Sequence, residues 1–407
     1  MAKAPAFIHF DHCEICFFIL YYTPVTKVNG RFGRSAMKVL FLSCSTGEGH
    51  NSAAYALQEE LESRGVDCVL ADPVAFGSEK ARKAVANTYN NIIKKVPAAF
   101  GMLYKVGDWY SAHELPSPIY YANSLYADNL CAFIEEQGFD LVVCTHLYAM
   151  EAMTCIYKRG KLSVPCYGVL TDYTCIPFFS DTRLTGYFIP HEELKQEVMD
   201  QGIPAERIFC TGIPVSPRFN QPMTKEEARN YLVLEQDRKL ILVMTGGVGC
   251  GHVAELCEKL LHYAGERTCI QVLCGRNSEM KEKIDLAFAR DPRVQTVTFT
   301  RKVDVYMKAA DVLITKPGGI SSSEAATVGI PLVLAQGIPG CETKNCEFFA
   351  AHGMAIKADT LDQAASSACY LANNEEAAER MVSMQHNTIH ADAAARIADI
   401  LMRECAE

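Results

Sequence analysis

Residues 311–335, DVLITKPGGISSSEAATVGIPLVLA, form the segment that indicates the fold most clearly. A short apolar run predicts a buried strand, a Lys-Pro-Gly-Gly turn and a Ser-rich helix follow, and a second apolar run predicts the next strand. Glycines in a strand-to-helix turn let a ligand approach the backbone, and the first turn of a helix has unpaired N–H groups. The stretch therefore predicts a βαβ unit whose helix start binds an anion.

The residues of this helix start offer two kinds of contact. Around Gly318, Gly319, Ile320 and Ser321, backbone amides would face the anion, and each such interaction is worth about 0.3 to 2 kcal/mol. Glu324 follows one turn later and is suited to accept hydrogen bonds from two vicinal hydroxyls. The amides would bind the phosphates and the carboxylate the ribose hydroxyls, so together they suit a nucleoside diphosphate.

Two further segments are expected beside the same crevice. In GIPGCETKNCEFFAAHG, residues 337–353, we expect Glu342 and Asn345 to lie in a loop, where they would meet sugar hydroxyls; a solvated loop leading into a helix is the alternative. The glycine-rich turn after the strand KLILVMT includes Gly247 and Gly249 and could accommodate a phosphate or a sugar. A turn without a ligand, with His252 exposed on the next helix, is the other interpretation.

The first strand is followed by a similar turn, STGEGHNSA, residues 45–53. His50 in this turn is a titratable imidazole at the carboxyl end of a strand, where αβ proteins bind ligands. A plain βα turn remains the alternative. The turn lacks G-x-G-x-x-G, and the chain lacks GxxxxGK[ST], so neither a dehydrogenase nor a P-loop NTPase is favoured.

The organisation of the chain follows from alternating apolar runs and helical patterns, which predict parallel sheets covered by helices. We expect one Rossmann-like domain over 37–215, a second over 223–385 and a C-terminal helix over 386–407, with the proline-rich 213–222 as linker. Residues 1–36 lack a regular period, and the strand pattern MKVLFLS starts at Met37. We therefore expect 1–36 to be an upstream extension or a poorly ordered tail.

Composition excludes several classes of protein. The 407 residues are 49% hydrophobic and 21% charged, which is typical of a folded chain, and the formal charge of −9 disfavours a nucleic-acid partner. No apolar run reaches the roughly 20 residues of a membrane-spanning helix. The 18 cysteines are scattered through apolar runs, as reduced thiols are, and the lone pair Cys13 and Cys16 has no partner pair at zinc spacing.

Seven motifs carry a family resemblance: STGEGHNSA, TDY, CTGIPV, MTGGVG, VLCGRN, ITKPGGISSSEA and PGCETKN, in this order. The set resembles the processive diacylglycerol β-glucosyltransferases of bacteria and the related monogalactosyldiacylglycerol synthases of plastids, in glycosyltransferase family 28. The similarity runs from about Met37 to the end of the chain. It implies an α/β fold of the GT-B type, in which two Rossmann-like domains face each other across a cleft and the second holds most of the nucleotide sugar.

The resemblance also implies roles for individual residues. Glu324 would hold the ribose, the Gly318-Gly319 turn the pyrophosphate, and Glu342 with Asn345 the hexose. Gly247 and its neighbours would approach the donor from the other side, and Arg276 would lie near the nucleotide. His50 would lie by the acceptor hydroxyl.

A lipid hydroxyl is a poor nucleophile until a general base removes its proton, and a histidine base contributes about 10²- to 10⁴-fold. His50 is the first candidate, and Asp172 is the second, either as the base or as the group that orients it. The sequence has no Asp-x-Asp pair, so we expect helix amides to stabilise the departing diphosphate and no metal to be essential. A single displacement would invert the anomeric centre and give a β-glycoside.

Residues 77–110 contain six basic and two acidic residues among aromatic and aliphatic ones. This mixture predicts a surface for an anionic leaflet, at about 1 kcal/mol for each basic residue. A charged helix face with a buried core segment is the alternative. The residues expected to contact membrane or acceptor are Lys94, Lys95, Phe100, Tyr104 and Trp109.

The function that we expect is transfer of a hexose, with glucose favoured, from a UDP-sugar to diacylglycerol or a glycolipid, on the cytoplasmic face of the cell membrane. An N-acetylglucosaminyltransferase acting on a lipid-linked cell-wall precursor is one alternative. The other is a regulator that binds the UDP-sugar without turnover.

Overall fold

The computed structural model describes residues 37–44, 48–77, 118–244, 252–335 and 341–405. Contacts divide the chain into 1–36 and 37–407, and only the second of these units is described. Three sets of predictions lie outside the described residues: the leading segment 1–36, the glycines Gly247 and Gly249, and the membrane-surface residues Lys94, Lys95, Phe100, Tyr104 and Trp109.

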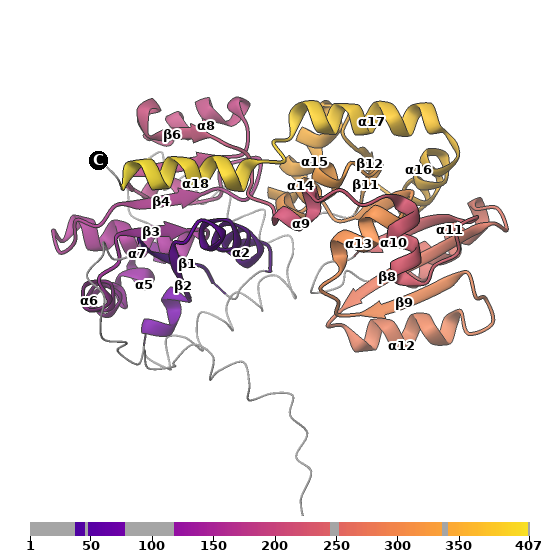
Figure 1. Cartoon of the computed structure of the whole chain (residues 1–407), viewed down its shortest axis with the longest axis horizontal. Coiled ribbons are helices and arrows are strands. Elements are labelled where there is room, and N and C mark those ends of the chain that lie inside the picture. The colour runs from indigo at the N-terminus through magenta and orange to yellow at the C-terminus, as the bar shows by residue number, and fades with distance from the viewer. Residues whose placement is uncertain (1–36, 45–47, 78–117, 245–251, 336–340, 406–407) are drawn as a thin grey trace, which may run out of the picture. The chain divides into compact units, whose positions relative to one another are not determined.

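The first half of the described chain is a parallel sheet of six strands in the order β2-β1-β3-β4-β5-β6 (Figure 1). Its strands are β1 (Lys38–Leu42), β2 (Asp67–Ala71), β3 (Leu141–Cys144), β4 (Cys166–Val169), β5 (Gly186–Ile189) and β6 (Ile208–Cys210). Its helices are α2 (Glu48–Ser63), α5 (Pro118–Ser124), α6 (Ala127–Gln137), α7 (Leu147–Lys158) and α8 (Lys195–Asp200), with 3-10 turns η1 (Pro73–Phe76), η2 (Phe179–Asp181), η3 (Glu192–Leu194) and η4 (Ala205–Arg207).

The second half is another parallel sheet of six strands, in the order β12-β11-β10-β7-β8-β9. Its strands are β7 (Lys239–Met244), β8 (Thr268–Gly275), β9 (Val294–Thr298), β10 (Val312–Thr315), β11 (Leu332–Ala335) and β12 (Ile356–Ala358). Helices α9 (Pro217–Asn220) and α10 (Lys225–Leu232) precede this sheet. The remaining helices are α11 (Val253–Tyr263), α12 (Ser278–Ala287), α13 (Val303–Ala309), α14 (Gly319–Val328), α15 (Cys341–Ala351), α16 (Leu361–Asn373), α17 (Glu375–Thr388) and α18 (Ala393–Glu404).

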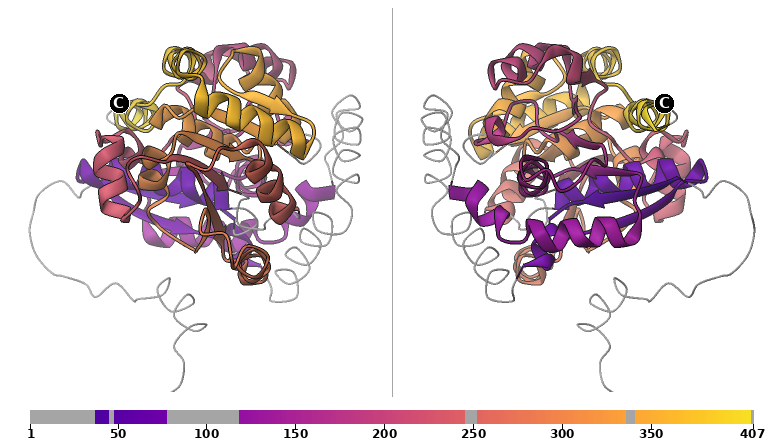
Figure 2. Two further views of the ribbon diagram at one scale, coloured as in Figure 1. Left: turned by 90° about the vertical axis from the view of Figure 1, so that its right-hand side faces the viewer. Right: turned by 90° about the vertical axis from the view of Figure 1, so that its left-hand side faces the viewer.

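Strand β1 shows why helices cover both faces of the sheet. Successive side chains of a strand point to opposite faces, and all four apolar residues from Val39 to Leu42 are fully buried. Val39 and Phe41 pack in one core with residues of α2 and α18, whereas Leu40 and Leu42 pack in another with residues of α6 and α7. Burying each such side chain contributes about 1.5–3 kcal/mol. Helices on both sides of the strands can be followed in Figure 2.

The end of the chain returns to the first half. Helix α18 packs beside α2, where Arg64 pairs with Asp399 at 2.5 Å, and the hydroxyl of Tyr167 in β4 donates to Glu404 at 3.0 Å (Figure 1). The C-terminal helix expected over 386–407 is therefore shorter, because α17 ends at Thr388 and α18 starts at Ala393. The chain crosses between the halves twice, at the linker and before α18.

The strand orders place two sequence motifs at special points. In the first sheet the order reverses between β1 and β3, and in the second between β7 and β10. Open parallel sheets bind ligands beyond the carboxyl ends of strands at such switch points. His50 follows β1, and the turn starting at Lys316 follows β10. The predicted fold class, α/β with two Rossmann-like halves, is confirmed.

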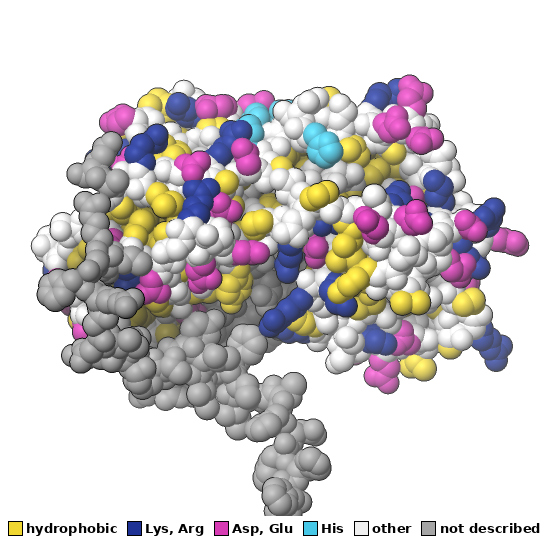
Figure 3. Space-filling view, in the orientation of Figure 1, with side chains coloured by type: hydrophobic (Ala, Val, Ile, Leu, Met, Phe, Trp, Pro, Cys, Tyr) yellow, Lys and Arg dark blue, Asp and Glu magenta, His cyan; other side chains and the backbone are white. Residues whose placement is uncertain are grey.

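The described surface carries charges of both signs with apolar side chains between them, on the face seen in Figure 3. Within the described part of the chain, no helix combines the length and the apolar character that crossing a bilayer requires.

Candidate active site

Helix α14 starts with backbone amides that no side chain caps. Its N-cap residue, Gly318, has extended backbone angles (φ −75°, ψ 137°), and no described side chain caps this turn. The amide of Ser322 makes a helical bond to the carbonyl of Gly318 at 3.0 Å, which leaves the amides of residues 319–321 as the helix start. Unpaired amides at a helix start favour an anion, and anion binding at this turn stays a prediction.

The start of α14 faces the first half of the molecule. A Cβ atom added to Gly319 would lie 2.0 Å from the carbonyl oxygen of Thr171, so only glycine permits this approach. A Cβ atom on Gly49 would lie 3.5 Å from the Ile320 side chain, which is ordinary contact. The starts of α2 and α14 are therefore in contact, and the turn that contains His50 lies beside the turn that contains Gly318.

His50 is half-buried, and its tautomer follows from its neighbours. Its Nδ1 atom lies 2.9 Å from the carbonyl oxygen of Thr145 and 3.0 Å from the hydroxyl of Thr171. A carbonyl only accepts hydrogen bonds, so Nδ1 carries the proton of the neutral ring. No described residue hydrogen-bonds Nε2, whose lone pair is thus available to accept a proton from a substrate.

Burial lowers the pKa of His50 from its usual 6.5, and the charge of Asp172 and the bond to Thr145 oppose this effect. His146, the N-cap of α7, contacts the His50 ring edge to face, with centroids 4.6 Å apart. Burial and the neighbouring His50 hold the pKa of His146 well below 6.5. Both imidazoles are therefore neutral near pH 7, the state that a general base requires.

Asp172 makes its hydrogen bond to the second half rather than to His50. Its Oδ1 accepts from Nδ2 of Asn345 at 2.7 Å. Thr145 and Thr171 orient the imidazole, so the expected orienting role of Asp172 is limited to its charge, which raises the pKa of His50. Asp172 as the base remains a prediction.

The expectation that Glu342 and Asn345 lie in a loop is wrong. Both lie in the first turns of α15, which starts at Cys341, and the two residues are 5% and 0% exposed. The segment is helical because Cys346 and Phe349 on one of its faces enter the core. The Glu342 carboxylate forms an ion pair with Lys316. The role of both residues in binding the hexose stays a prediction.

Glu324 and Arg276, both predicted to contact the nucleotide, differ in their surroundings. Glu324 is half-buried and has no hydrogen bond from any described residue; burial raises its pKa to about 7, and Arg218 opposes that rise. A carboxylate that receives no hydrogen bond from the described residues is suited to accept hydrogen bonds from ribose hydroxyls. Arg276 is exposed after β8, where its guanidinium lies 5.1 Å from the centroid of the exposed Phe299 ring.

Several residues at the site were missed by sequence analysis. They share one feature, which is a position directly after a strand of a parallel sheet. The carboxyl ends of such strands meet at one edge, so their order alone could have indicated them. These residues are Thr145 and His146 after β3, Thr171 and Tyr173 after β4, and Lys316 after β10.

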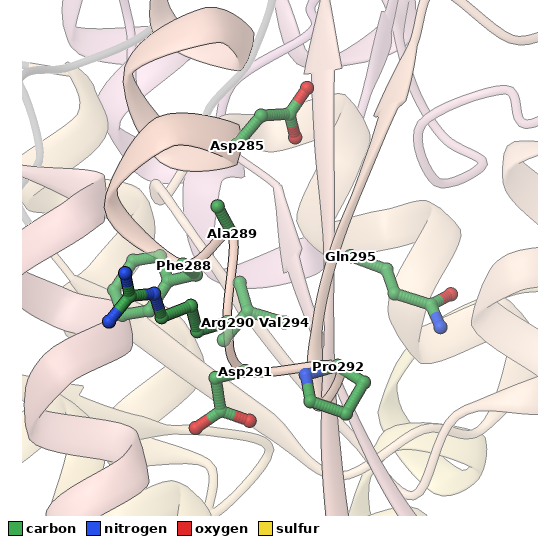
Figure 4. A pocket seen from close by; sticks show the side chains of 8 residues that line it. All are labelled: Asp285, Phe288, Ala289, Arg290, Asp291, Pro292, Val294 and Gln295. Atoms are coloured by element: carbon green, nitrogen blue, oxygen red, sulfur yellow. The ribbon is translucent and has the colours of Figure 1, made fainter.

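A shallow pocket lies away from this site, in the connection between α12 and β9 (Figure 4). It precedes β9, so it lies at the amino edge of the sheet, and its acids have partners: Asp291 pairs with Arg293 at 2.6 Å and Asp285 with Lys281. No group of three His, Cys, Asp or Glu residues among those described could hold a metal ion. The lining residues of the pocket are Asp285, Phe288, Ala289, Arg290, Asp291, Pro292, Val294 and Gln295.

Family models match both halves of the chain. The family model of monogalactosyldiacylglycerol (MGDG) synthase matches residues 50–215, and that of the glycosyltransferase family 28 C-terminal domain matches 240–396. A processive diacylglycerol β-glucosyltransferase of Bacillus cytotoxicus is 26% identical over 372 residues, which are 90% of this chain and 94% of the relative.

Solved structures show the same fold at lower identity. MurG of Acinetobacter baumannii superposes with a TM-score of 0.60 at 14% identity, covering 90% of this chain and 99% of MurG. Anabaena Alr3699/HepE, in complex with UDP-glucose, superposes with a TM-score of 0.55 at 12% identity, covering 90% and 100%.

The first model ends at residue 215 and the second starts at residue 240. The first covers strands β2 to β6, and the second covers the second sheet from Leu240 of β7 onward, with its switch point. The chain belongs to the MGDG synthase and glycosyltransferase family 28 group of GT-B enzymes, and it is a glycosyltransferase.

Proposed function

We propose that this chain transfers a hexose, with glucose expected, from a UDP-sugar to diacylglycerol and produces a β-glycosyl diacylglycerol. One observation carries the proposal. The uncapped start of α14 lies against the carboxyl end of β4, beside an imidazole whose Nε2 is available. A helix start for a diphosphate and a base for a hydroxyl thus lie together.

The donor would lie on the second half. The amides of residues 319–321 would bind the diphosphate, and Glu324, which lacks partners among the described residues, would accept hydrogen bonds from the ribose hydroxyls. The B. cytotoxicus relative, named as a diacylglycerol β-glucosyltransferase, supports glucose and diacylglycerol as the substrates.

The reaction would be one displacement. Nε2 of His50 takes the proton of the acceptor hydroxyl as its oxygen attacks the anomeric carbon, and the bond from that carbon to the β-phosphate oxygen breaks. The electron pair stays with UDP, whose new charge faces the amides of α14. Attack opposite the leaving group inverts the anomeric centre.

No essential metal is proposed. Amides at the start of α14 would supply positive charge at the expected diphosphate position, whereas the ammonium of Lys316, two residues before its N-cap, is paired with Glu342. We also propose that the enzyme associates peripherally with the cytoplasmic face of the membrane, where diacylglycerol would be reached. The lipid chemistry of the relative supports this association.

The test is incubation of the full chain with labelled UDP-glucose, UDP-galactose or UDP-N-acetylglucosamine and diacylglycerol in mixed micelles, with and without EDTA, followed by lipid chromatography. We expect a labelled β-glucosyl lipid from UDP-glucose, formed at the same rate in EDTA. Transfer to lipid only from UDP-N-acetylglucosamine, with none from UDP-glucose or UDP-galactose, would contradict the proposal. Binding of UDP-glucose without any labelled lipid would instead indicate a regulator.

A further inference from the structure

Asn345 uses its side-chain amide to join the two halves. Its Oδ1 accepts from the backbone N–H of Tyr173 at 2.7 Å, and its Nδ2 donates to Oδ1 of Asp172 at 2.7 Å and to the carbonyl of Pro317 at 3.0 Å. An amide offers four hydrogen-bonding positions, so three of them are used, and the side chain is 0% exposed. While Asn345 makes these hydrogen bonds, no part of its side chain is exposed to a sugar hydroxyl.

Tyr173 adds a second connection beside the first. Its ring stacks on Phe348 of α15 with centroids 4.4 Å apart, and its hydroxyl lies 2.9 Å from that of Ser323 in α14. The Ser323 hydroxyl donates to the carbonyl of Gly319 at 2.8 Å. Tyr173 is 7% exposed and belongs to the core of the second half, although it follows β4 of the first.

This connection is adjacent to the proposed base. Thr171, two residues before Tyr173, contacts Nδ1 of His50 with its hydroxyl and the start of α14 with its carbonyl. Each of the three residues from 171 to 173 is therefore in contact with the second half. Any change at the start of α14 or α15 would reach the surroundings of His50 through this segment.

We propose that Asn345 and Tyr173 form a latch through which the donor-binding half positions Thr171 and Asp172 around His50. Asn345 is then a positioning residue for the base. The His50 ring has its correct surroundings only while the contacts of Asn345 and Tyr173 between the two halves are formed. The proposal rests on the proposed function for its meaning in catalysis. The effect of Asn345 on the titration of His50 can nevertheless be measured without any substrate.

The test is a pH titration of the His50 ring by NMR in the full chain, with the ring signals identified by their loss in His50→Gln. Among the described residues, the charged and titratable groups that face His50 are Asp172 after β4 and His146 at the start of α7. In Asn345→Ala the Asp172 carboxylate loses the bond that fixes it, so its stabilisation of the protonated ring weakens. We expect the pKa of His50 to fall by about 0.5 to 1 unit.

Tyr173→Phe is the milder variant, because it removes only the hydroxyl that contacts Ser323; we expect a smaller fall of the same sign. Gln385→Ala is the matched control, since Gln385 is a buried amide of the second half that bonds the carbonyls of Ile330 and Met354 at 3.0 and 2.9 Å. This control is expected to lower stability and to leave the His50 titration unchanged.

Kinetics add a second measurement. For a latch, Asn345→Ala lowers kcat by about 10-fold or more and leaves the affinity for UDP unchanged, because UDP contains no hexose and the buried Asn345 exposes no atom to a diphosphate. An unchanged His50 titration, with only KM for the UDP-sugar raised, would overturn the latch and make Asn345 a hexose ligand. Lack of turnover in the unmodified chain would overturn the proposed function alone, since the titration would still report the coupling.

Discussion

Helices α2 and α14 start at equivalent positions of the two sheets, but the side chains at their starts differ. Each follows a strand at a switch point of a parallel sheet, and each has glycine in its first turns. The third residue of α2 is His50, whose Nδ1 proton is fixed on the carbonyl of Thr145. The first turn of α14 has no acidic residue and no side-chain cap.

At both helix starts the backbone creates the binding position, and the side chains determine which chemistry occurs there. Both helix starts could bind an anion by their amides. A neutral imidazole at the start of α2 makes that turn a proton acceptor, whereas the bare start of α14 keeps its amides available for a diphosphate. Substitutions at the two starts should therefore affect different kinetic parameters.

The largest effect is expected from removing the base. His50→Gln should lower kcat by about 10²- to 10⁴-fold, because no neighbouring residue in the described part of the chain offers another available basic nitrogen to replace Nε2. The affinity for UDP, measured by calorimetry, should stay within about twofold of the original. His262→Gln, at an exposed histidine of α11, is the control. Retained turnover in His50→Gln would move the base assignment to Asp172.

A smaller but still large effect is expected at the start of α14. In Gly319→Ala the new Cβ would lie 2.0 Å from the Thr171 carbonyl, so the two segments must separate. We expect kcat to fall by about 10- to 100-fold, with weaker binding of UDP, as the geometry around both groups is lost. Initial-rate assays measure kcat, and calorimetry measures the affinity for UDP.

Gly49→Ala is the matched change at the other helix start, where the added Cβ meets Ile320 at 3.5 Å in ordinary contact. It should preserve most of the activity. Equal losses in both variants would mean that any added methyl group between the two starts is harmful, and the contrast between them would fail.

Much of this architecture follows from sequence because parallel strands are apolar throughout and glycine turns interrupt them. The βαβ unit at 311–335 and the position of His50 after β1 needed only local patterns. Local patterns could not give the contact of Asn345 with Asp172, which joins residues 173 positions apart. They also missed that Glu342 lies in a helix, because its ion pair with Lys316 and the packing of α15 are tertiary effects.

The smallest of the expected effects concerns Glu324. Burial raises its pKa to about 7, so this carboxyl is mostly protonated at pH 6 and mostly ionised at pH 8. Folding is favoured by the protonated form, and that contribution is lost as pH rises through about 7. Ribose hydroxyls donate to the ionised form. Binding of the ribose should therefore strengthen with rising pH.

Uridine is the appropriate probe, because it carries the ribose without the phosphates, which titrate in the same range. Its affinity, measured by calorimetry or NMR, should rise by up to about tenfold between pH 6 and pH 8. Glu324→Gln should bind uridine with little pH dependence, since an amide does not titrate. A pH-independent affinity in the original chain would place the ribose elsewhere, and the start of α14 would then differ from that of α2 only in its binding of the diphosphate.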